Sequence, residues 1–282
     1  MQHNQARQTP IEEYRADSEP FYLPIANEVE SFEAAYLNHI PVLLKGPTGC
    51  GKTRFVEYMS WRLGNQNSGV ALPLVTINCH EDLTAGDLVG RFLLNNSNTE
   101  WVDGPLTRAV KHGGICYLDE VVEARKDTIV VIHSLTDYRR FLPIDKLGLI
   151  IDADDQFLLV VSYNPGYQST LKDLKHSTRQ RFAAIEFGYP PPETEAAIIA
   201  HEAGVSNGVA ESLAHLGAKL RNLDSLEMLE GPNTRLLIYA GKLMRHGMPF
   251  RGAVEMAVTQ AVTDDHQLQN GIREVAEAIF SD

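Results

Sequence analysis

The segment GPTGCGKT, residues 46–53, constrains this chain more than any other feature. Its spacing, G-x-x-x-x-G-K-[ST], is typical of a phosphate-binding loop, in which successive backbone N–H groups turn inward around phosphate oxygens. Glycines permit backbone conformations and a close approach that a Cβ would block. The predicted nucleotide-binding residues are Gly46, Pro47, Thr48, Gly49, Cys50, Gly51, Lys52 and Thr53. Lys52 is placed to reach the β- and γ-phosphates, and the Thr53 hydroxyl to reach Mg²⁺.

The residues around this loop predict an α/β fold. Residues 41–45 before it are an apolar run, and residues 54–63 after it have a helical pattern. Four more apolar runs follow, at residues 72–78, 115–118, 157–162 and 183–187. Several are nearly continuous rather than alternating, as in strands covered on both faces, and helical stretches at 106–111 and 127–136 lie between them. We therefore predict a doubly wound, five-stranded parallel sheet with the ligand at the carboxyl ends of its strands.

After residue 188 the sequence no longer alternates between strand and helix patterns. Helical patterns cover residues 193–203, 208–220, 234–246, 251–262 and 267–280. We predict a polar N-terminal extension over residues 1–24, a nucleotide-binding α/β core over 25–188 and a small all-helical lid domain over 189–282.

Composition limits the class of protein. The 282 residues contain no apolar run of the length needed to span a membrane, and the polar start is not typical of a signal peptide, so a cytoplasmic location is expected. The net charge is −12 and there is no basic stripe, which argues against a nucleic-acid partner and for protein partners. Three cysteines without a C-x-x-C pair argue against a disulfide framework.

Two carboxylates follow the apolar run in ICYLDE, residues 115–120. Asp119, at the end of this predicted strand, can hold the Mg²⁺ shell beside Thr53. Glu120 can polarise a water for attack on the γ-phosphate, which a transferase acting on a small substrate would exclude. A D-E pair alone is often a solvated loop, but a strand before it and a phosphate loop in the same chain favour a hydrolytic site.

Three later segments carry further candidates. Asn164, in LLVVSYNPG, is the polar tip of a predicted strand and a candidate nucleotide sensor, although Asn before Pro-Gly alone indicates a turn. Arg179 and Arg181, in STRQRF, lie just before the last predicted strand, where a neighbouring subunit's γ-phosphate is the natural target; the alternative is a surface pair that binds carboxylates. Arg235, in GPNTRLL, begins a lid helix and is a second candidate sensor.

The order of these motifs resembles that of AAA+ ATPases, from about residue 25 to near the end of the chain. The segment at 87–114 resembles the helix-2 insert of the MoxR branch, and that at 139–157 resembles the β-hairpin before the first sensor. The CbbQ/NirQ/NorQ group is the one most similar to three segments of this chain, GPTGCGKT, VVSYNPGYQ and STRQRF.

This resemblance implies a ring-forming, hexameric protein that hydrolyses ATP with Mg²⁺ and works with a von Willebrand factor A-domain adaptor. The ring would remodel or activate a metabolic enzyme, with Rubisco, freed of inhibitory sugar phosphates, as the first expectation and nitric oxide reductase activation or metal-cofactor insertion as the alternative. It also implies catalytic roles for Glu120 and the first sensor Asn164, fingers in trans from Arg179, Arg181 or both, a metal role for Asp119, and second-sensor function for Arg235.

One departure from protein-threading AAA+ proteins concerns the pore loop. No aromatic-hydrophobic-Gly segment follows the second predicted strand, where HEDLTAGDLVG, residues 80–90, stands instead. This favours action on a folded target through the insert or the partner protein. Phe92 and Trp101 are candidates for that contact, with a buried structural role as the alternative.

Other classes share some of these features. A small-molecule kinase has the same loop, but Glu120, Asn164 and the helical lid argue against it. An interaction module that uses ATP only to assemble a ring is a second alternative. A DNA-dependent AAA+ activator is disfavoured by the acidic balance and by the absence of a GAFTGA-like loop.

Overall fold

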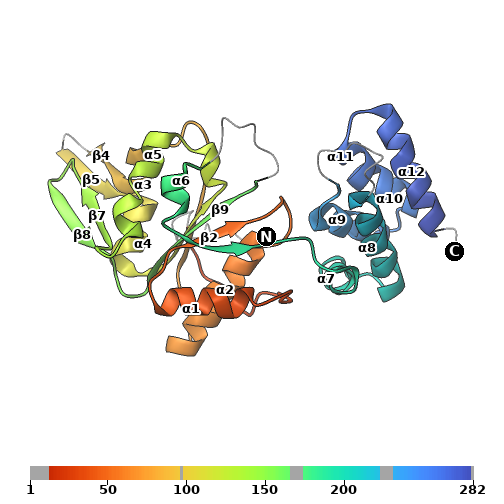
Figure 1. Ribbon diagram of the computed structural model, residues 1–282, viewed down its shortest axis with the longest axis horizontal. Helices are drawn as coiled ribbons and strands as arrows, with labels where there is room; N and C mark the ends of the chain where they lie inside the picture. Colours follow the sequence, from red (N-terminus) through yellow and green to blue (C-terminus); the bar gives the residue numbers. More distant parts are fainter. Residues whose placement is uncertain (1–12, 96–97, 166–173, 223–230, 281–282) are drawn as a thin grey trace, which may run out of the picture. The chain divides into compact units, whose positions relative to one another are not determined.

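The computed structural model describes residues 13–95, 98–165, 174–222 and 231–280. Contacts divide the chain into two units (Figure 1). The first comprises Met1–Phe21, Ala26–Lys45 and Lys52–Glu186, and the second comprises Tyr22–Ile25, Gly46–Gly51 and Phe187–Asp282. Residues 1–12, the first half of the predicted extension at 1–24, lie outside the described part. The extension and the proposed 188/189 domain boundary stay predictions.

The first unit is built on a six-stranded sheet in the order β1-β3-β6-β9-β2-β10. Its strands are β1 (Glu13–Tyr14), β2 (Val42–Lys45), β3 (Leu74–Asn78), β6 (Gly114–Asp119), β9 (Phe157–Tyr163) and β10 (Ala183–Glu186). Every neighbouring pair is parallel except β1 with β3. The five predicted strands are thus confirmed, while the short antiparallel edge strand β1 was not predicted. All seven residues of β9 are buried, which explains why its sequence is continuously apolar.

Helices connect the parallel strands. They are α1 (Glu28–Leu37), α2 (Lys52–Ser68), α3 (Ala85–Val89), α4 (Pro105–His112), α5 (Lys126–Val130) and α6 (His176–Arg179), with 3₁₀ turns at Val121–Glu123 and His133–Thr136. Both α2 and α4 contact β6, the strand near the middle of the sheet. Leu106 and Val110 of α4 are fully buried in one core cluster with Cys116 of β6. The helix expected at 127–136 is shorter than predicted and ends at Val130.

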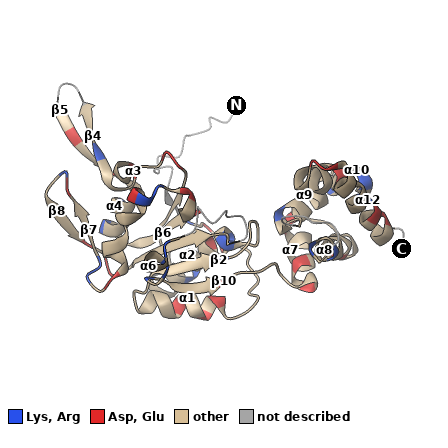
Figure 2. Cartoon of the chain, turned by 45° about the horizontal axis from the view of Figure 1, so that its top comes forward, with Lys and Arg blue, Asp and Glu red and all other residues tan. Residues whose placement is uncertain are grey.

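Two β-hairpins extend from this unit. One joins β4 (Gly90–Asn95) to β5 (Asn98–Asp103) between α3 and α4, in the segment predicted to be the helix-2 insert. The other joins β7 (Phe141–Ile144) to β8 (Leu149–Asp152) ahead of β9, where the second hairpin was expected. Both views show the two hairpins at the same end of the first unit (Figures 1 and 2).

The second unit is a helical bundle. Its helices are α7 (Pro192–Ala203), α8 (Asn207–Arg221), α9 (Thr234–Arg245), α10 (Phe250–Val254), α11 (Gln260–Val262) and α12 (His266–Phe280), with a π-helical turn at Glu255–Thr259. Their apolar faces form one buried cluster that includes Ile199, Leu213, Leu237, Val258 and Ile272. Residues 223–230 lie outside the described part of the chain.

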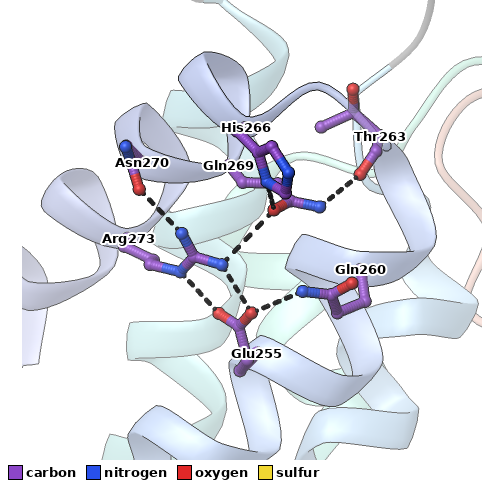
Figure 3. A network of polar contacts seen from close by, with 7 residues as sticks. All are labelled: Glu255, Gln260, Thr263, His266, Gln269, Asn270 and Arg273. Carbon is purple, nitrogen blue, oxygen red and sulfur yellow. Dashed lines mark hydrogen bonds and ion pairs between the residues drawn. The ribbon is translucent and has the colours of Figure 1, made fainter.

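A polar network joins α12 to the segment that contains the π-helical turn (Figure 3). Arg273 donates to both carboxylate oxygens of Glu255, at 2.8 and 2.7 Å, and to Asn270 Oδ1 at 2.7 Å. Gln260 Nε2 also donates to Glu255, at 2.7 Å. The Glu255 pKa is lowered to about 2, first because Arg273 hydrogen-bonds its carboxylate.

Within the part of the chain that the structure describes, no helix combines the length and apolar character that crossing a membrane requires.

Candidate nucleotide-hydrolysis site

The sheet order brings the predicted site residues of the first unit to one edge. Strand β9 lies between β2 and β6, and Tyr163 pairs with Lys45, the residue before the phosphate loop. Asp119 ends β6, and Asn164 directly follows β9. Because the carboxyl ends of parallel strands meet at the same edge, the acid pair and the predicted first sensor lie at the same edge of the sheet as Lys45, at the end of β2.

Helix α2 begins at Lys52, so Lys52 and Thr53 occupy its first turn. The N-terminus of a helix favours bound phosphate because its N–H groups and dipole face the anion. Gly49 and Gly51 have φ values of +71° and +101°, conformations that L side chains rarely adopt. Thr53 also hydrogen-bonds with the side chain of Tyr117, which places the start of α2 beside the end of β6.

The Asp119 carboxylate is held by two hydroxyl groups. Tyr117 Oη donates to Asp119 Oδ1 at 2.6 Å, and Ser162 Oγ donates to the same oxygen at 2.5 Å. Tyr117 is fully buried, and burial raises the pKa of its phenol, with the nearby Asp119 charge adding to the effect. The phenol therefore stays protonated and acts as a donor at neutral pH.

Glu120 has an unusual backbone conformation. Its φ and ψ angles are +54° and +49°, in the left-handed region, and its N–H donates to Ser162 Oγ at 3.0 Å. Its side chain is exposed, whereas Asp119 beside it is half-buried. The structure thus supplies a solvent-facing carboxylate next to a fixed one, as activation of an attacking water requires.

The two candidate finger arginines differ in their surroundings. The Arg179 guanidinium lies over the ring of Tyr163 in its own chain, with Cζ 5.6 Å from the ring centroid. Arg181 is exposed, and its Nη1 lies 3.5 Å from the His133 carbonyl oxygen. The pKa of His133 is lowered, mainly by burial and then by the positive charge of Arg181 and Lys175. The finger role of either arginine stays a prediction.

The first six loop residues and Arg235 belong to the second unit. Within that unit, Tyr189 Oη donates to the Thr48 carbonyl at 3.3 Å, and a Cβ on Gly49 would lie 2.6 Å from Asn233 Cγ. Asn233 caps α9 by accepting the Leu236 N–H. Arg235 is the second residue of α9 and is exposed, as a residue that contacts a ligand must be.

The donors in the first unit fit Mg²⁺ by their chemistry. Carboxylate and hydroxyl oxygens from Asp119, Ser162 and Thr53 meet around Tyr117, and Mg²⁺ prefers oxygen ligands. Among the described residues, no group of three or more His, Cys, Asp and Glu side chains could hold a metal by itself. Mg²⁺ is commonly held by one or two carboxylates together with substrate phosphates, and Asp119 is the residue that could supply such a carboxylate here.

The two predicted target contacts on hairpin β4–β5, Phe92 and Trp101, differ in exposure. Phe92 is 46% exposed, whereas Trp101 is half-buried, packs edge-on against Phe92 at 5.1 Å and donates from Nε1 to Asp103 at 2.7 Å. Leu93 and Leu94 of the same strand are also exposed. Trp101 therefore stabilises the hairpin, and Phe92, Leu93 and Leu94 form its apolar surface.

Two residues of the site, Tyr117 and Ser162, were not predicted from the sequence. Side chains at i and i+2 of a strand point to the same side. Tyr117 stands two residues before Asp119, and Ser162 two residues before Asn164. Strand periodicity could have identified both as neighbours of the predicted residues.

Comparisons with known proteins agree with this arrangement. Residues 41–182 match the family described as AAA domain (dynein-related subfamily), and residues 195–279 match the CbbQ/NirQ/NorQ C-terminal family. A mutant of Thermotoga maritima RuvB superposes with a TM-score of 0.53 at 18% identity, over 93% of this chain and 73% of that chain, and so shares the fold.

Two relatives are similar over nearly the whole chain. Protein CbbQ of Hydrogenophilus thermoluteolus is 54% identical over 95% of this chain and 98% of its own length. Protein NorQ of Paracoccus denitrificans (strain Pd 1222) is 55% identical over 93% of this chain and 94% of its own length. The predicted α/β fold and ATPase class are confirmed, and the chain belongs to the CbbQ/NirQ/NorQ group of AAA+ ATPases, in the MoxR branch that its motifs indicated.

Proposed function

We propose that this ATPase couples ATP hydrolysis to the remodelling and activation of a metabolic enzyme. The observation that supports hydrolysis best is the exposed Glu120 beside the anchored Asp119. A carboxylate at this position orients a water for attack on the γ-phosphate. A kinase would use the same loop but would exclude such a water.

Each site residue has a chemical task in this proposal. Lys52 binds the β- and γ-phosphates, while Thr53 and Asp119 hold Mg²⁺ and its water shell. When bound, the ion would supply positive charge that offsets the negative charge of the phosphates. Asn164 donates its side-chain amide to the attacking water or to the γ-phosphate, and Glu120 accepts a proton from that water.

The complete site requires a neighbouring subunit. We propose a cytoplasmic homo-hexamer in which an arginine from STRQRF reaches the γ-phosphate of the adjacent subunit. Arg235 senses the same phosphate from α9. Its place at the start of a helix in the second unit supports a role in linking nucleotide state to the position of the lid.

The enzyme to be activated is inferred from the motifs and relatives of this chain, which support two candidates. Relatives named CbbQ and NorQ are 54% and 55% identical, so identity alone favours neither. The resemblance of the sequence motifs gave Rubisco activation as the first expectation, and we retain it. In this proposal a von Willebrand factor A-domain adaptor takes part. Activation of nitric oxide reductase or metal-cofactor insertion is the alternative that the similarity to NorQ supports. The exposed apolar residues Phe92, Leu93 and Leu94 of β4 are our candidate contact with the adaptor or target.

The variant Glu120→Gln tests this function. It keeps the side chain's size but removes its charge, so we expect the variant to bind ATP and assemble with wild-type affinity. Phosphate release should fall at least about 100-fold, as for loss of a general base. Activation of sugar-phosphate-inhibited Rubisco in the presence of the adaptor should disappear, with nitric oxide reductase assayed in parallel. Glu211→Gln, at an exposed acid on α8 of the second unit, is the control.

The result separates the rival classes. If Glu120→Gln activates a target as well as the wild type, ATP serves assembly only and the motor proposal is wrong. If the wild type transfers its γ-phosphate to a small acceptor rather than to water, the protein acts as a kinase.

A further inference from the structure

Two buried hydroxyl groups converge on one oxygen of the Asp119 carboxylate. Tyr117 reaches Oδ1 along its own strand, β6, and Ser162 reaches it from the neighbouring strand, β9. Two donors on the same oxygen restrict rotation of the carboxylate. A carboxylate fixed in this way would keep one orientation toward a metal-bound water.

Ser162 has a second partner. Its Oγ donates to Asp119 and accepts from the N–H of Glu120, and a hydroxyl can do both at once because it has one donor hydrogen and two lone pairs. One side chain thereby fixes the carboxylate of Asp119 and the backbone of Glu120. The bond to the Glu120 N–H restrains the backbone in its left-handed conformation and so helps to set the direction in which the side chain leaves it.

Burial separates the supporting groups from the reacting ones. Tyr117 and Ser162 are both fully buried, whereas Asp119 is half-buried and Glu120 exposed. A buried hydroxyl without a partner costs about 1–3 kcal/mol, which favours the bonds that are present. The donors therefore hold their geometry while the carboxylates face solvent.

We propose that Tyr117 and Ser162 are positioning residues of the ATPase site: both orient Asp119 toward the nucleotide-bound divalent ion, and Ser162 also orients Glu120 toward water. The inference rests on the roles proposed above for Asp119 and Glu120. It predicts that the two residues differ in effect, because only Ser162 contacts both members of the acid pair.

The first test measures metal binding without turnover. Mn²⁺ replaces Mg²⁺, and the free-ion electron paramagnetic resonance signal is followed as Mn²⁺ is added to the full-length protein with saturating ADP. Tyr117→Phe removes one oxygen, and we expect Mn²⁺ affinity to fall roughly 10-fold, as for other residues that orient metal ligands. Tyr36→Phe, at another buried tyrosine on α1, should leave it unchanged.

The second test separates the two residues by turnover. At saturating Mg²⁺, Tyr117→Phe should regain a kcat within about threefold of the wild type. Ser162→Ala should keep a kcat at least about 10-fold lower even there, because Glu120 has lost its anchor. Ser162→Thr retains the hydroxyl and should restore most of the rate. Ser60→Ala, at a fully buried serine whose hydroxyl donates to the Leu72 carbonyl, controls for loss of a buried hydroxyl.

Thermal unfolding of each variant shows whether it is folded, and Ser162→Thr and Tyr117→Phe are conservative enough to keep the tests informative. An Mn²⁺ affinity of Tyr117→Phe within twofold of wild type, or equal kcat losses in Tyr117→Phe and Ser162→Ala at saturating metal, overturns the inference. A wild type that binds Mn²⁺·ADP but does not hydrolyse ATP contradicts the proposed function instead, so the two failures are distinguishable.

Discussion

The Arg179 guanidinium lies over the ring of Tyr163, with Cζ 5.6 Å from the ring centroid. Tyr163 is buried at the end of β9 and directly precedes Asn164, the predicted first sensor. Through this contact, the segment before β10 packs against the end of β9 within one chain. Arg181, two residues later, is exposed and is thus the better candidate to reach a neighbouring subunit.

Arg181→Ala should abolish hydrolysis while keeping ATP affinity. A finger in trans contributes about 10³–10⁵ in rate, and we expect a loss of at least 10³-fold in phosphate release. Arg179→Ala should instead lower the free energy of unfolding by about 1 kcal/mol through the lost cation–π contact, which Arg179→Lys should partly restore.

Mixed assemblies distinguish a finger in trans from one in cis. When Arg181→Ala subunits are combined with Glu120→Gln subunits, some sites pair an intact Glu120 with an intact neighbouring Arg181, so activity should reappear. No recovery in mixtures that do form joint rings would place Arg181 outside the neighbour's site.

Removal of one partner of the buried Glu195–Arg221 ion pair should strongly destabilise the second unit. Glu195 is fully buried and accepts two bonds from Arg221, at 2.8 and 2.7 Å, as well as one from Thr234 at 2.6 Å. Arg221→Met leaves the carboxylate buried without its partner, and urea unfolding should show a loss of about 3–5 kcal/mol.

Arg251→Met is the matched control for that loss. Arg251 pairs with Glu277 at 3.4 Å, but both side chains are largely exposed, so its removal should change the free energy of unfolding by less than about 1 kcal/mol. Equal effects of the two variants would contradict the importance of burial.

The network in Figure 3 predicts a pH dependence in the acid range. The pKa of Glu255 falls from 4.5 to about 2, first because Arg273 hydrogen-bonds the carboxylate. The unfolded chain therefore binds a proton at higher pH than the folded one, and the stabilisation is complete above about pH 4.5 and lost as the pH falls toward 2. Because both side chains are more than one-third exposed, we expect a contribution below about 1 kcal/mol. Arg273→Met should flatten this part of the stability curve, measured by urea unfolding between pH 6 and 3.

The exposed apolar residues of β4 should affect target activation without affecting hydrolysis. Leu94 is 80% exposed, so Leu94→Ser should alter the free energy of unfolding by less than about 0.5 kcal/mol and leave basal ATPase activity unchanged. Activation of the target enzyme should fall several-fold. Leu37→Ser, at a residue 73% exposed on α1, is the control, and an equal loss there would argue against a role for the hairpin.

Much of the fold follows from local sequence patterns. The nearly continuous apolar runs predicted all five parallel strands because strands buried on both faces tolerate few polar residues. The helix at 127–136 was predicted too long. It contains the β-branched run Thr128–Ile129–Val130–Val131–Ile132, whose low helix propensity agrees with an end of α5 at Val130. Edge strand β1 and the π-helical turn depend on tertiary contacts, such as Glu255 with Arg273, that no local pattern contains.

Only the site residues that belong to sequence motifs were predictable. Motif spacing identified Lys52, Thr53, Asp119 and Glu120 as candidates, whereas the bonds from Tyr117 and Ser162 to Asp119 depend on which strands are neighbours. The order of the strands depends on the whole sheet and not on any one segment of sequence. Similarly, the difference between Arg179 and Arg181 comes from the position of Tyr163 in space and not from their shared motif.

The left-handed backbone of Glu120 has a consequence for how this protein evolves. A non-glycine residue in that region costs about 1–2 kcal/mol, so Gly at position 120 would give a more stable chain without a hydrolytic carboxylate. Selection for activity and selection for stability thus oppose each other at one position. A search for thermostable variants that is not also screened for ATP turnover should recover Glu120→Gly, a variant that lacks ATPase activity.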